Sequence, residues 1–265
     1  MLKTLFLNCL LIAGSLFCRE LQGSQEVLKM RENWLSAIAE PQEQSQDVFA
    51  WYSTVPHWRF NCIIRFAYED QLEEHLDSLI GKALPNAPIS VWLDPKDNNT
   101  ALIEALKSRN FVVGGCYPSM SWDVEPTEAP QLDIRAVNIE EFLDTYAVCY
   151  SYSEELKQAS INLLQDRSGE LFLAYLDGKP VGTATLFVHG DIGMVFHVAT
   201  LPEYQRKGVA TAMMHYIMNQ ASNRGLKKLV LNSSSAAEKL YYNLEFQKVD
   251  EVVVYVRDPL KAKVH

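Results

Sequence analysis

The chain has 265 residues, 48% of them hydrophobic, and a formal net charge of -9. Because single domains usually run to about 100 to 150 residues, this length predicts two domains. Nucleic acid and anionic membranes demand a basic footprint, which an acidic chain without a dense Lys/Arg cluster does not offer. We therefore expect a small-molecule or peptide partner, with no nucleic acid and no membrane, and a monomer or homodimer.

The cysteine pattern indicates a reducing compartment and no metal site. The five cysteines are odd in number, widely scattered and without CxxC or Cys/His spacing. They are Cys9, Cys18, Cys62, Cys116 and Cys149. We interpret them as buried free thiols of a cytoplasmic protein.

The apolar N-terminal segment, Met1 to Phe17, has two possible interpretations. With Lys3 near its start it has the outline of a secretory signal, although Asn8 and Cys9 interrupt the apolar run. It is too short to span a bilayer as a helix. Its spacing at helical period favours a retained, mostly buried helix, and a cleaved export signal stays the alternative.

Helices and strands alternate through the first half of the chain. The apolar spacing predicts helices over residues 25–39, 69–84 and 100–109, and strands over 60–66, 89–93 and 111–124. Residues 125–130 contain two prolines and two acids and resemble a linker. We therefore expect an N-terminal domain over residues 1–125 and a second domain over 131–265.

The second half resumes the alternation with longer elements. Strands are predicted at residues 132–136, 171–176, 180–188, 193–200 and 228–232, helices at 139–149, 154–164, 208–224 and 236–244, and further strands over 246–256. An Asp177-Gly178 turn and a Gly190-Asp191 turn join successive strands as hairpins. The order is therefore hairpins first and a βαβ unit afterwards.

The two halves share an internal repeat. A strand at Val91–Asp94, a helix and the tetrapeptide Ser108–Phe111 match a strand at Leu229–Asn232, a helix and Asn243–Phe246. In both copies a strand pair is expected to follow. The alternative is that any two βαβ pieces look alike.

The stretch from Phe196 to Thr211 passes from an apolar strand through a short loop into a long helix. Gly208 permits a close approach of the backbone, and the small Ala210 keeps the helix start clear. Unpaired amides converge at a helix N-terminus, where the helix dipole also favours an anion. Arg206 and Lys207 add positive charge, so the loop suits a pyrophosphate. The alternative is a helix start that happens to contain a glycine.

This loop resembles the pyrophosphate loop of the GNAT superfamily of N-acetyltransferases, whose pattern Q/R-x-x-G-x-G/A matches Gln205 to Ala210. The resemblance implies acetyl-CoA as cosubstrate. It also implies that the end of the preceding strand contacts the pantetheine and acetyl portions, and that the loop and helix start cradle the pyrophosphate. The strand residues are Val198, Ala199 and Thr200, and the loop residues are Arg206, Lys207, Gly208, Val209, Ala210 and Thr211.

A second match to the same family follows one strand later. Family members carry an Asn or Ser, then a Tyr seven residues on, then a Phe five residues after that, and this chain has Ser234, Tyr241 and Phe246. The resemblance places Ser234 with the cofactor-binding residues. Glu245 replaces the usual Gly, so the geometry of that turn is not carried over. Together the motifs cover roughly residues 132–257.

Acetyl transfer to an amine explains why such residues are needed. An alkylamine has a pKa near about 10.4 and must lose a proton before it attacks the thioester. Charge that develops on the carbonyl oxygen needs a preorganised donor, which a splayed strand can supply through the amide near Val198. By the family pattern, Tyr241 is the catalytic residue that protonates the departing sulfur. The alternative role for Tyr241 is packing at the core edge beside Tyr242.

The general base is not determined by the sequence. Strand alternation puts Met194, Phe196 and Val198 on one face and His197 on the other, so His197 is expected to be a core histidine unless a bulge reverses the parity. His189, at a hairpin tip, is a weaker candidate. Glu154 and Glu155 are weaker still, and a water chain or an already neutral amine stays possible.

The resemblance implies an α/β (α+β) fold with two GNAT-like mixed-sheet domains in tandem, in which a twisted, mostly antiparallel sheet is flanked by helices. The first half lacks a pyrophosphate loop between Phe66 and Ile89, so we expect a degenerate copy that walls the acceptor pocket or covers a sheet edge. The expected activity is direct transfer of acetyl from acetyl-CoA to a primary amine in a ternary complex. A non-catalytic acyl-CoA sensor and an exported binding protein are the alternatives.

Overall fold

The computed structural model describes residues 23–94, 96, 99–167 and 169–259. The helix predicted in the apolar N-terminal segment, with Cys9 and Cys18, lies outside these residues. In the N-terminal half, the observed elements are α1 Ser24–Ile38, β1 Glu43–Gln44, β2 Phe49–Tyr52, the 3-10 helix η1 Trp58–Phe60, β3 Asn61–Ile64, α2 Leu72–Lys82, β4 Ile89–Leu93, α3 Thr100–Ser108 and β5 Val112–Asp123. The sequence did not predict β1 or β2. All four residues of β2 are buried, so that strand has no polar alternation to reveal it.

The C-terminal half follows the predicted element order closely. Its elements are β6 Asp133–Val137, α4 Ile139–Tyr150, α5 Glu154–Leu164, β7 Glu170–Leu176, β8 Lys179–His189, β9 Ile192–Thr200, α6 Val209–Asn223, β10 Lys228–Asn232, α7 Glu238–Asn243 and β11 Gln247–Arg257. The prediction of a strand pair after each repeat was wrong, because β5 and β11 are single long strands. Two further 3-10 turns, at Gln165–Arg167 and Pro202–Tyr204, complete this half.

All strands of the described residues belong to one sheet, in the order β1-β2-β3-β4-β11-β5-β10-β9-β8-β7-β6. Two neighbouring pairs, β3–β4 and β9–β10, are parallel, and the others are antiparallel. This arrangement confirms the predicted α/β class with a mixed, mostly antiparallel sheet flanked by helices.

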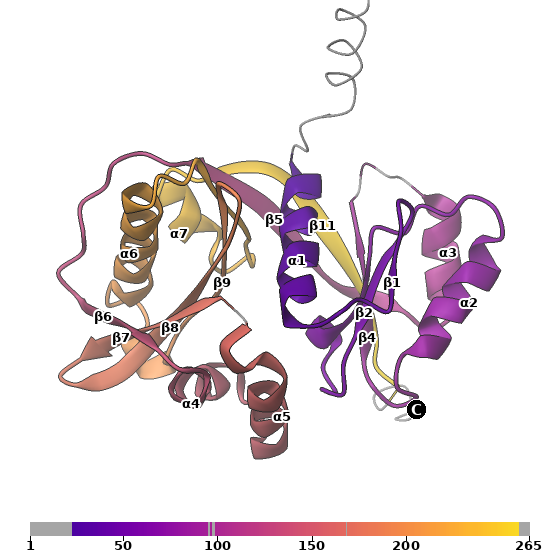
Figure 1. The fold of residues 1–265 in the computed structure, drawn as a ribbon, viewed down its shortest axis with the longest axis horizontal. Helices are drawn as coiled ribbons and strands as arrows, with labels where there is room; N and C mark the ends of the chain where they lie inside the picture. Colours follow the sequence, from indigo (N-terminus) through magenta and orange to yellow (C-terminus); the bar gives the residue numbers. More distant parts are fainter. Residues whose placement is uncertain (1–22, 95, 97–98, 168, 260–265) are drawn as a thin grey trace, which may run out of the picture.

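The two halves exchange strands at the centre of the sheet. Strand β11 lies between β4 and β5, and β5 in turn lies between β11 and β10, so each long strand pairs with both halves. In Figure 1 these two strands cross the middle of the molecule and join the left and right lobes. Read outward from this centre, the order of β4, β3, β2 and β1 mirrors that of β10, β9, β8 and β7.

Three apolar clusters hold the sheet and helices together. The largest packs α1, α4 and α5 against strands of both halves. A second lies beneath α6 and α7, and a third beneath α2 and α3. Because the largest cluster draws from both halves, α1 packs directly on the C-terminal half, where the Trp34 and Phe196 rings meet edge to face at 4.7 Å. The space between the halves is therefore a packed interior, and the cavity described below lies within it.

The turns after α3 and α7 have the same geometry. Asn110 and Glu245 both adopt a left-handed backbone, with φ of 63° and 65°. After each, the amide of Phe111 or Phe246 donates to a carbonyl five residues earlier, on Leu106 or Tyr241, at 3.0 Å. The usual glycine turn is thus retained at Glu245. Leu106 occupies in the first half the place that Tyr241 has in the second.

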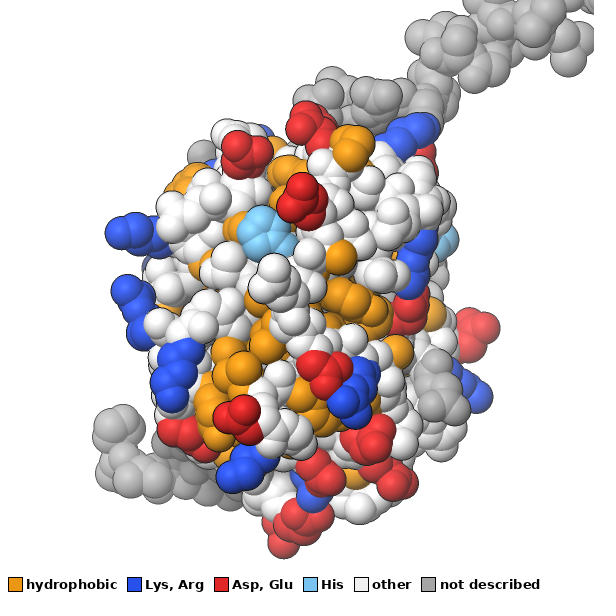
Figure 2. Space-filling view, turned by 90° about the vertical axis from the view of Figure 1, so that its left-hand side faces the viewer, with side chains coloured by type: hydrophobic (Ala, Val, Ile, Leu, Met, Phe, Trp, Pro, Cys, Tyr) orange, Lys and Arg blue, Asp and Glu red, His pale blue; other side chains and the backbone are white. Residues whose placement is uncertain are grey.

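Figure 2 views the face of the C-terminal lobe, where apolar side chains fill the centre and acidic side chains are mixed among basic ones near the rim. Among the described residues no helix is long and apolar enough to cross a membrane, and no group of three His, Cys, Asp or Glu side chains could hold a metal. Cys62 is buried and free, as predicted. Cys116 is also free but exposed, so the expectation that it is buried was wrong.

Candidate active site

The ladder between β9 and β10 opens before either strand ends. Three residue pairs form it, the last of them Met194 with Val230, although β9 continues to Thr200 and β10 to Asn232. The strands therefore splay, which leaves the β10-facing edge of β9 beyond Met194 without a strand partner. Without a strand partner on this edge, the backbone amide near Val198 can donate a hydrogen bond to the carbonyl oxygen of a thioester.

A β-bulge in β9 changes which side chains face the opening. The register with β8 shifts between Thr183 and Thr185, and His197 adopts a left-handed backbone with φ of 56°. After the bulge, Val198 packs with the α6 cluster, while Ala199 packs with the cluster that contains Met194. The expectation that His197 lies on the opposite face was therefore wrong, because the extra residue reverses the alternation.

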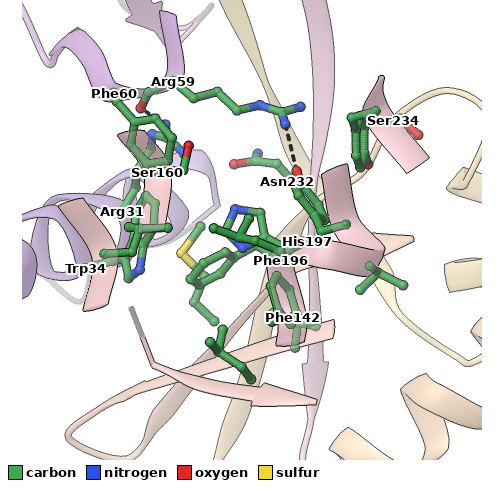
Figure 3. A pocket seen from close by; sticks show the side chains of 18 of the residues that line it. Arg31, Trp34, Arg59, Phe60, Phe142, Ser160, Phe196, His197, Asn232 and Ser234 are labelled. Carbon is green, nitrogen blue, oxygen red and sulfur yellow. Dashed lines mark hydrogen bonds between the residues drawn. The ribbon is translucent and has the colours of Figure 1, made fainter. Parts of the chain in front are cut away.

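A cavity of about 150 Å³ begins where β9 and β10 separate and extends to the N-terminal half. Val198, Asn232, Ser234 and Tyr241 line it from the C-terminal half, and His197 lies at its middle (Figure 3). The first half contributes Arg31 and Trp34 of α1, Trp58, Arg59 and Phe60 of η1, and Trp92 of β4. Tyr146, Tyr150 and Tyr152 close it on the side of α4. Both halves therefore build this cavity.

His197 is a neutral imidazole held by its neighbours on β8. Its Nδ1 lies 3.2 Å from Thr185 Oγ1, and its carbonyl accepts a hydrogen bond of 2.7 Å from Thr183 Oγ1. The rings of Phe196 and Tyr146 lie 4.6 Å and 4.9 Å away. Burial, followed by the charges of Arg59 and Arg31, holds the pKa of His197 well below its usual range. At neutral pH this imidazole is therefore uncharged, with one ring nitrogen that carries no proton.

Tyr241 is 5% exposed, and its ring meets Phe246 at 5.8 Å. Burial raises the pKa of its phenol, so the hydroxyl stays protonated at neutral pH and can donate. The side chain projects from α7 into the same cavity as Ser234. Two of the three residues of the second motif, Ser234 and Tyr241, thus line the same cavity.

The predicted pyrophosphate loop leads into α6 with the expected geometry. Gly208 is the residue before the helix and has φ of 82°, a conformation that L side chains rarely adopt. A Cβ built there would meet no atom within 4 Å, so the space beside it is open to a ligand. The first amides of α6, which have no partner within the helix, face the N-terminal end of that helix. This geometry fits a phosphate group.

The equivalent position in the first half does not fit an anion. Helix α2 joins the parallel strands β3 and β4, as α6 joins β9 and β10. Gln71 precedes α2 with φ of 51°, and Glu73 and Glu74 occupy the first turn. Two carboxylates at a helix start repel a phosphate.

The structure brings some predicted site residues together and separates others. Val198, Ser234, Tyr241 and His197 share the cavity. The backbone positions Ala199 and Thr200 continue β9 toward the loop of residues 206–211, outside the residues that line the cavity. His189, Glu154 and Glu155 are exposed and do not line it.

The sequence did not identify Arg31 and Arg59 as site residues. One signal was present, because Arg31 lies four residues from both Val27 and Leu35 and so interrupts the apolar face of a helix with a charge. A charged residue on a buried helix face calls for a partner. Arg59 has no comparable signal.

Comparison with known proteins places the second half in a family. Residues 136–246 match the model of the acetyltransferase (GNAT) family. The [ribosomal protein bS18]-alanine N-acetyltransferase of Escherichia coli strain K12 is 31% identical over 86 residues. That match spans 58% of the relative and 30% of this chain.

Solved structures resemble nearly the whole chain in fold. A GCN5-related N-acetyltransferase from Kribbella flavida has a TM-score of 0.64 at 17% identity, over 88% of this chain and 95% of its own. Another from Sphaerobacter thermophilus has a TM-score of 0.60 at 13% identity, over 80% and 76%. At such identities the likeness concerns the fold alone. The family match, the splayed strands and the loop before α6 together show that this chain carries an acetyltransferase domain of the GNAT family in residues 136–246.

Proposed function

We propose that this protein transfers an acetyl group from acetyl-CoA to a primary amine by direct attack in a ternary complex. The observation that carries the proposal is the meeting of Val198, Ser234, Tyr241 and His197 around one cavity at the point where β9 and β10 separate. Cysteines that could carry the acetyl group are absent from the described lining of this cavity, which supports direct transfer.

The loop from Arg206 to Thr211 would hold the pyrophosphate. Its support is the left-handed Gly208, the open space beside it and the unpaired amides of the first turn of α6. From there the end of β9, including Ala199 and Thr200, leads toward the cavity. The thioester would then lie beside Val198, where the splayed edge of the strand offers backbone donors to the carbonyl oxygen.

His197 is the best-supported general base. It lies inside the cavity, is neutral at physiological pH and is oriented by Thr185. Thr185 contacts the Nδ1 of the ring, so the amine would approach the other ring nitrogen, Nε2. An ammonium acceptor would give its proton to His197 and attack as the neutral amine.

Tyr241 would complete the reaction from the other side of the thioester. A protonated phenol on the cavity wall can donate to the sulfur as it departs. A non-catalytic sensor would need no general base, so the presence of His197 in the cavity favours the enzyme over the sensor alternative.

We further propose that residues 1–125 are a degenerate copy of the acetyltransferase fold and residues 131–265 the catalytic domain. The mirrored strand order, the identical turns at Asn110 and Glu245, and the acidic start of α2 support this division. The first half would then contribute acceptor contacts and no cofactor site.

An acceptor screen tests the proposed activity. The full chain would be incubated with acetyl-CoA and a panel of primary amines, with mass detection of the acetylated product and of released CoA. We expect product with at least one amine and none without enzyme. Tight acetyl-CoA binding without product across the panel would support the sensor and contradict the enzyme.

A further inference from the structure

Two guanidinium groups from the N-terminal half line the cavity opposite the acetyltransferase motifs. Arg31 projects from α1, and its Nη2 donates to the carbonyl of Arg59 at 3.0 Å. Arg59 belongs to η1, and its Nη1 donates to the hydroxyl of Tyr146 at 3.1 Å. In Figure 3, Arg31 lies to the left of His197 and the Arg59 side chain runs above it. Uncharged groups, a backbone carbonyl and a phenol, therefore hold the two cations on the wall of this cavity.

Neither arginine pairs with a carboxylate among the described residues. Salt bridges to carboxylates are formed by other arginines of the described residues, namely Arg65, Arg109, Arg135 and Arg224. Neither Arg31 nor Arg59 has such a bridge there. No Asp or Glu side chain is among the described residues that line the cavity. The wall therefore carries two positive charges without an acidic partner.

The acidic groups beside these arginines stay protonated at neutral pH. Burial raises the pKa of the Cys62 thiol to about 11, and burial also raises the pKa of the Tyr146 phenol well above its usual range. Arg31 itself keeps its charge, since burial lowers its pKa only to about 10. The described residues around the arginines thus provide aromatic rings but no negative charge. The guanidinium carbon of Arg31, for example, lies 3.9 Å from the centre of the Trp92 ring.

Such an arrangement is costly unless an anion binds there. A buried guanidinium without a counter-ion loses hydration that ring contacts replace only in part. Only 8% of the Arg31 surface is exposed, and its buried Nε has no hydrogen-bond partner. A planar guanidinium with free donors is the geometry that recognises a carboxylate.

We propose that the acceptor amine also bears a carboxylate, as an amino acid does, and that Arg31 and Arg59 bind this carboxylate. The proposal rests on the proposed acetyltransferase function. With its carboxylate at the arginines, the acceptor would direct its amine toward His197 and the thioester end of the cavity. In the reaction the acceptor ammonium first gives one proton to His197, and the neutral amine nitrogen then forms a bond to the acetyl carbon as the carbon–sulfur bond breaks. The sulfur takes a proton from Tyr241, and the second proton that the nitrogen loses restores the Tyr241 phenol. The products are the amide, the CoA thiol and one proton that His197 releases to solvent.

The phosphates of CoA are a less suitable source of the anion. The loop of residues 206–211 is not part of the cavity lining, and it precedes α6 on the opposite lobe from α1. The aromatic rings around the arginines, among them Trp34 and Phe60, also suit a carbon skeleton better than a polyphosphate. The acetyl-CoA affinity of the arginine variants distinguishes the two sources, because it falls only if the arginines bind a phosphate of CoA rather than the acceptor carboxylate.

Matched acceptors provide the test on the full chain. Glycine, alanine, leucine and phenylalanine would each be compared with the corresponding primary amide, which keeps the amine and loses the negative charge. We expect kcat/KM for at least one amino acid to exceed that of its amide by about 100-fold or more, since a charge-assisted bidentate contact is lost. Amides acetylated as well as or better than all four amino acids would overturn the proposal.

Arginine variants provide the second arm. Arg59→Gln should raise KM for the preferred amino acid by about tenfold or more and reduce the preference over the amide, while Arg59→Lys should restore part of it. Arg135→Gln is the control, because Arg135 is exposed, is paired with Asp133 and lies outside the cavity. Acetyl-CoA affinity, measured by calorimetry, should be unchanged in all three variants and so report an intact fold.

The outcomes distinguish failure of the inference from failure of the proposed function. If no amine of any kind is acetylated, the proposed function fails, and the inference fails with it. If amines without a carboxylate are acetylated and amino acids are not, the function stands and the inference is overturned. A loss of acetyl-CoA affinity in a folded Arg59→Gln variant would assign the arginine to the cofactor and likewise overturn it.

Discussion

Thr185 Oγ1 lies 3.2 Å from Nδ1 of His197, so a side chain on β8 orients the imidazole that the bulge in β9 turns into the cavity. We expect Thr185→Val, which removes the hydroxyl and keeps the shape, to lower kcat by about tenfold because the base is no longer held in its productive orientation. Thr183→Val is the control, since Thr183 bonds only the carbonyl of His197. The kcat against pH profile of both variants would be measured. A wild-type profile in Thr185→Val would show that Thr185 does not orient the base.

Gly208→Glu should abolish acetyl-CoA binding, because the new side chain would occupy the phosphate position with a like charge. Gly178→Glu is a matched control. It has a similar positive φ, 75° against 82°, and equally open space, but lies in a hairpin turn away from the loop. Calorimetry should give one site per chain for the wild type and for the control. Unchanged affinity in folded Gly208→Glu would refute the assignment.

Tyr241→Phe should reduce turnover by about 100-fold or more while acetyl-CoA affinity survives, since only the hydroxyl is removed from a well-packed ring. The neighbouring Tyr242→Phe should leave turnover unchanged, because Tyr242 is exposed and bonds Glu238 on the surface. Rates would be compared from pH 6 to 9 on the acceptor that the screen yields. Near wild-type turnover across that range would make Tyr241 a packing residue.

Glu245→Gly should stabilise the fold. A left-handed L residue costs about 1 to 2 kcal/mol, and the flexibility of glycine in the unfolded chain offsets about 0.5 to 1 kcal/mol of it, which leaves a gain of up to about 1.5 kcal/mol. Asn110→Gly, at the equivalent turn, should gain less because Asn tolerates this conformation better. Urea unfolding of both variants would test the order. A larger gain at Asn110 would contradict the explanation.

His57 should make the protein less stable as the pH falls. Burial, followed by the charges of Arg59 and Arg31, lowers its pKa from 6.5 to about 4, so between these values the unfolded chain binds more protons than the folded one. The free energy of unfolding should then fall by up to about 1.4 kcal/mol per pH unit on this account. The imidazole Nδ1 accepts from the amide of Arg59 at 3.2 Å, a contact that protonation would break.

His57→Asn should remove this part of the pH dependence, because an Asn side chain can accept the same hydrogen bond without titrating. Unfolding would be measured at intervals from pH 7.5 to 4.5. We expect similar stability at pH 7.5 and a shallower decline below pH 6.5 in the variant. The pKa of His197 is also lowered, so His197 contributes a pH dependence of the same sign. Because His197 is present in both proteins, the difference between the two curves reports on His57. Parallel curves would contradict the neutral state of His57.

The sequence was sufficient for most of the elements and for the cofactor end of the site. Apolar periodicity is a local property, and it located α1, β4, α5 and β10 to within a residue or two. The loop before α6 could be recognised because the conformation of Gly208 and the free amides of a helix start depend on neighbouring residues alone. Likewise Ser234 and Tyr241 keep a fixed spacing on one short segment.

Long-range pairing decided the acceptor end of the site. The bulge at His197 arises from the register of β9 on β8, and the exchange of β5 and β11 brings α1 against the C-terminal half. Arg31 and Arg59 therefore reach a cavity whose motifs lie more than 130 residues away in the chain. Strand alternation predicted the wrong face for His197, since one extra residue inverts every side chain that follows. Such registers depend on which strands pair across the whole sheet, and no local pattern encodes that choice.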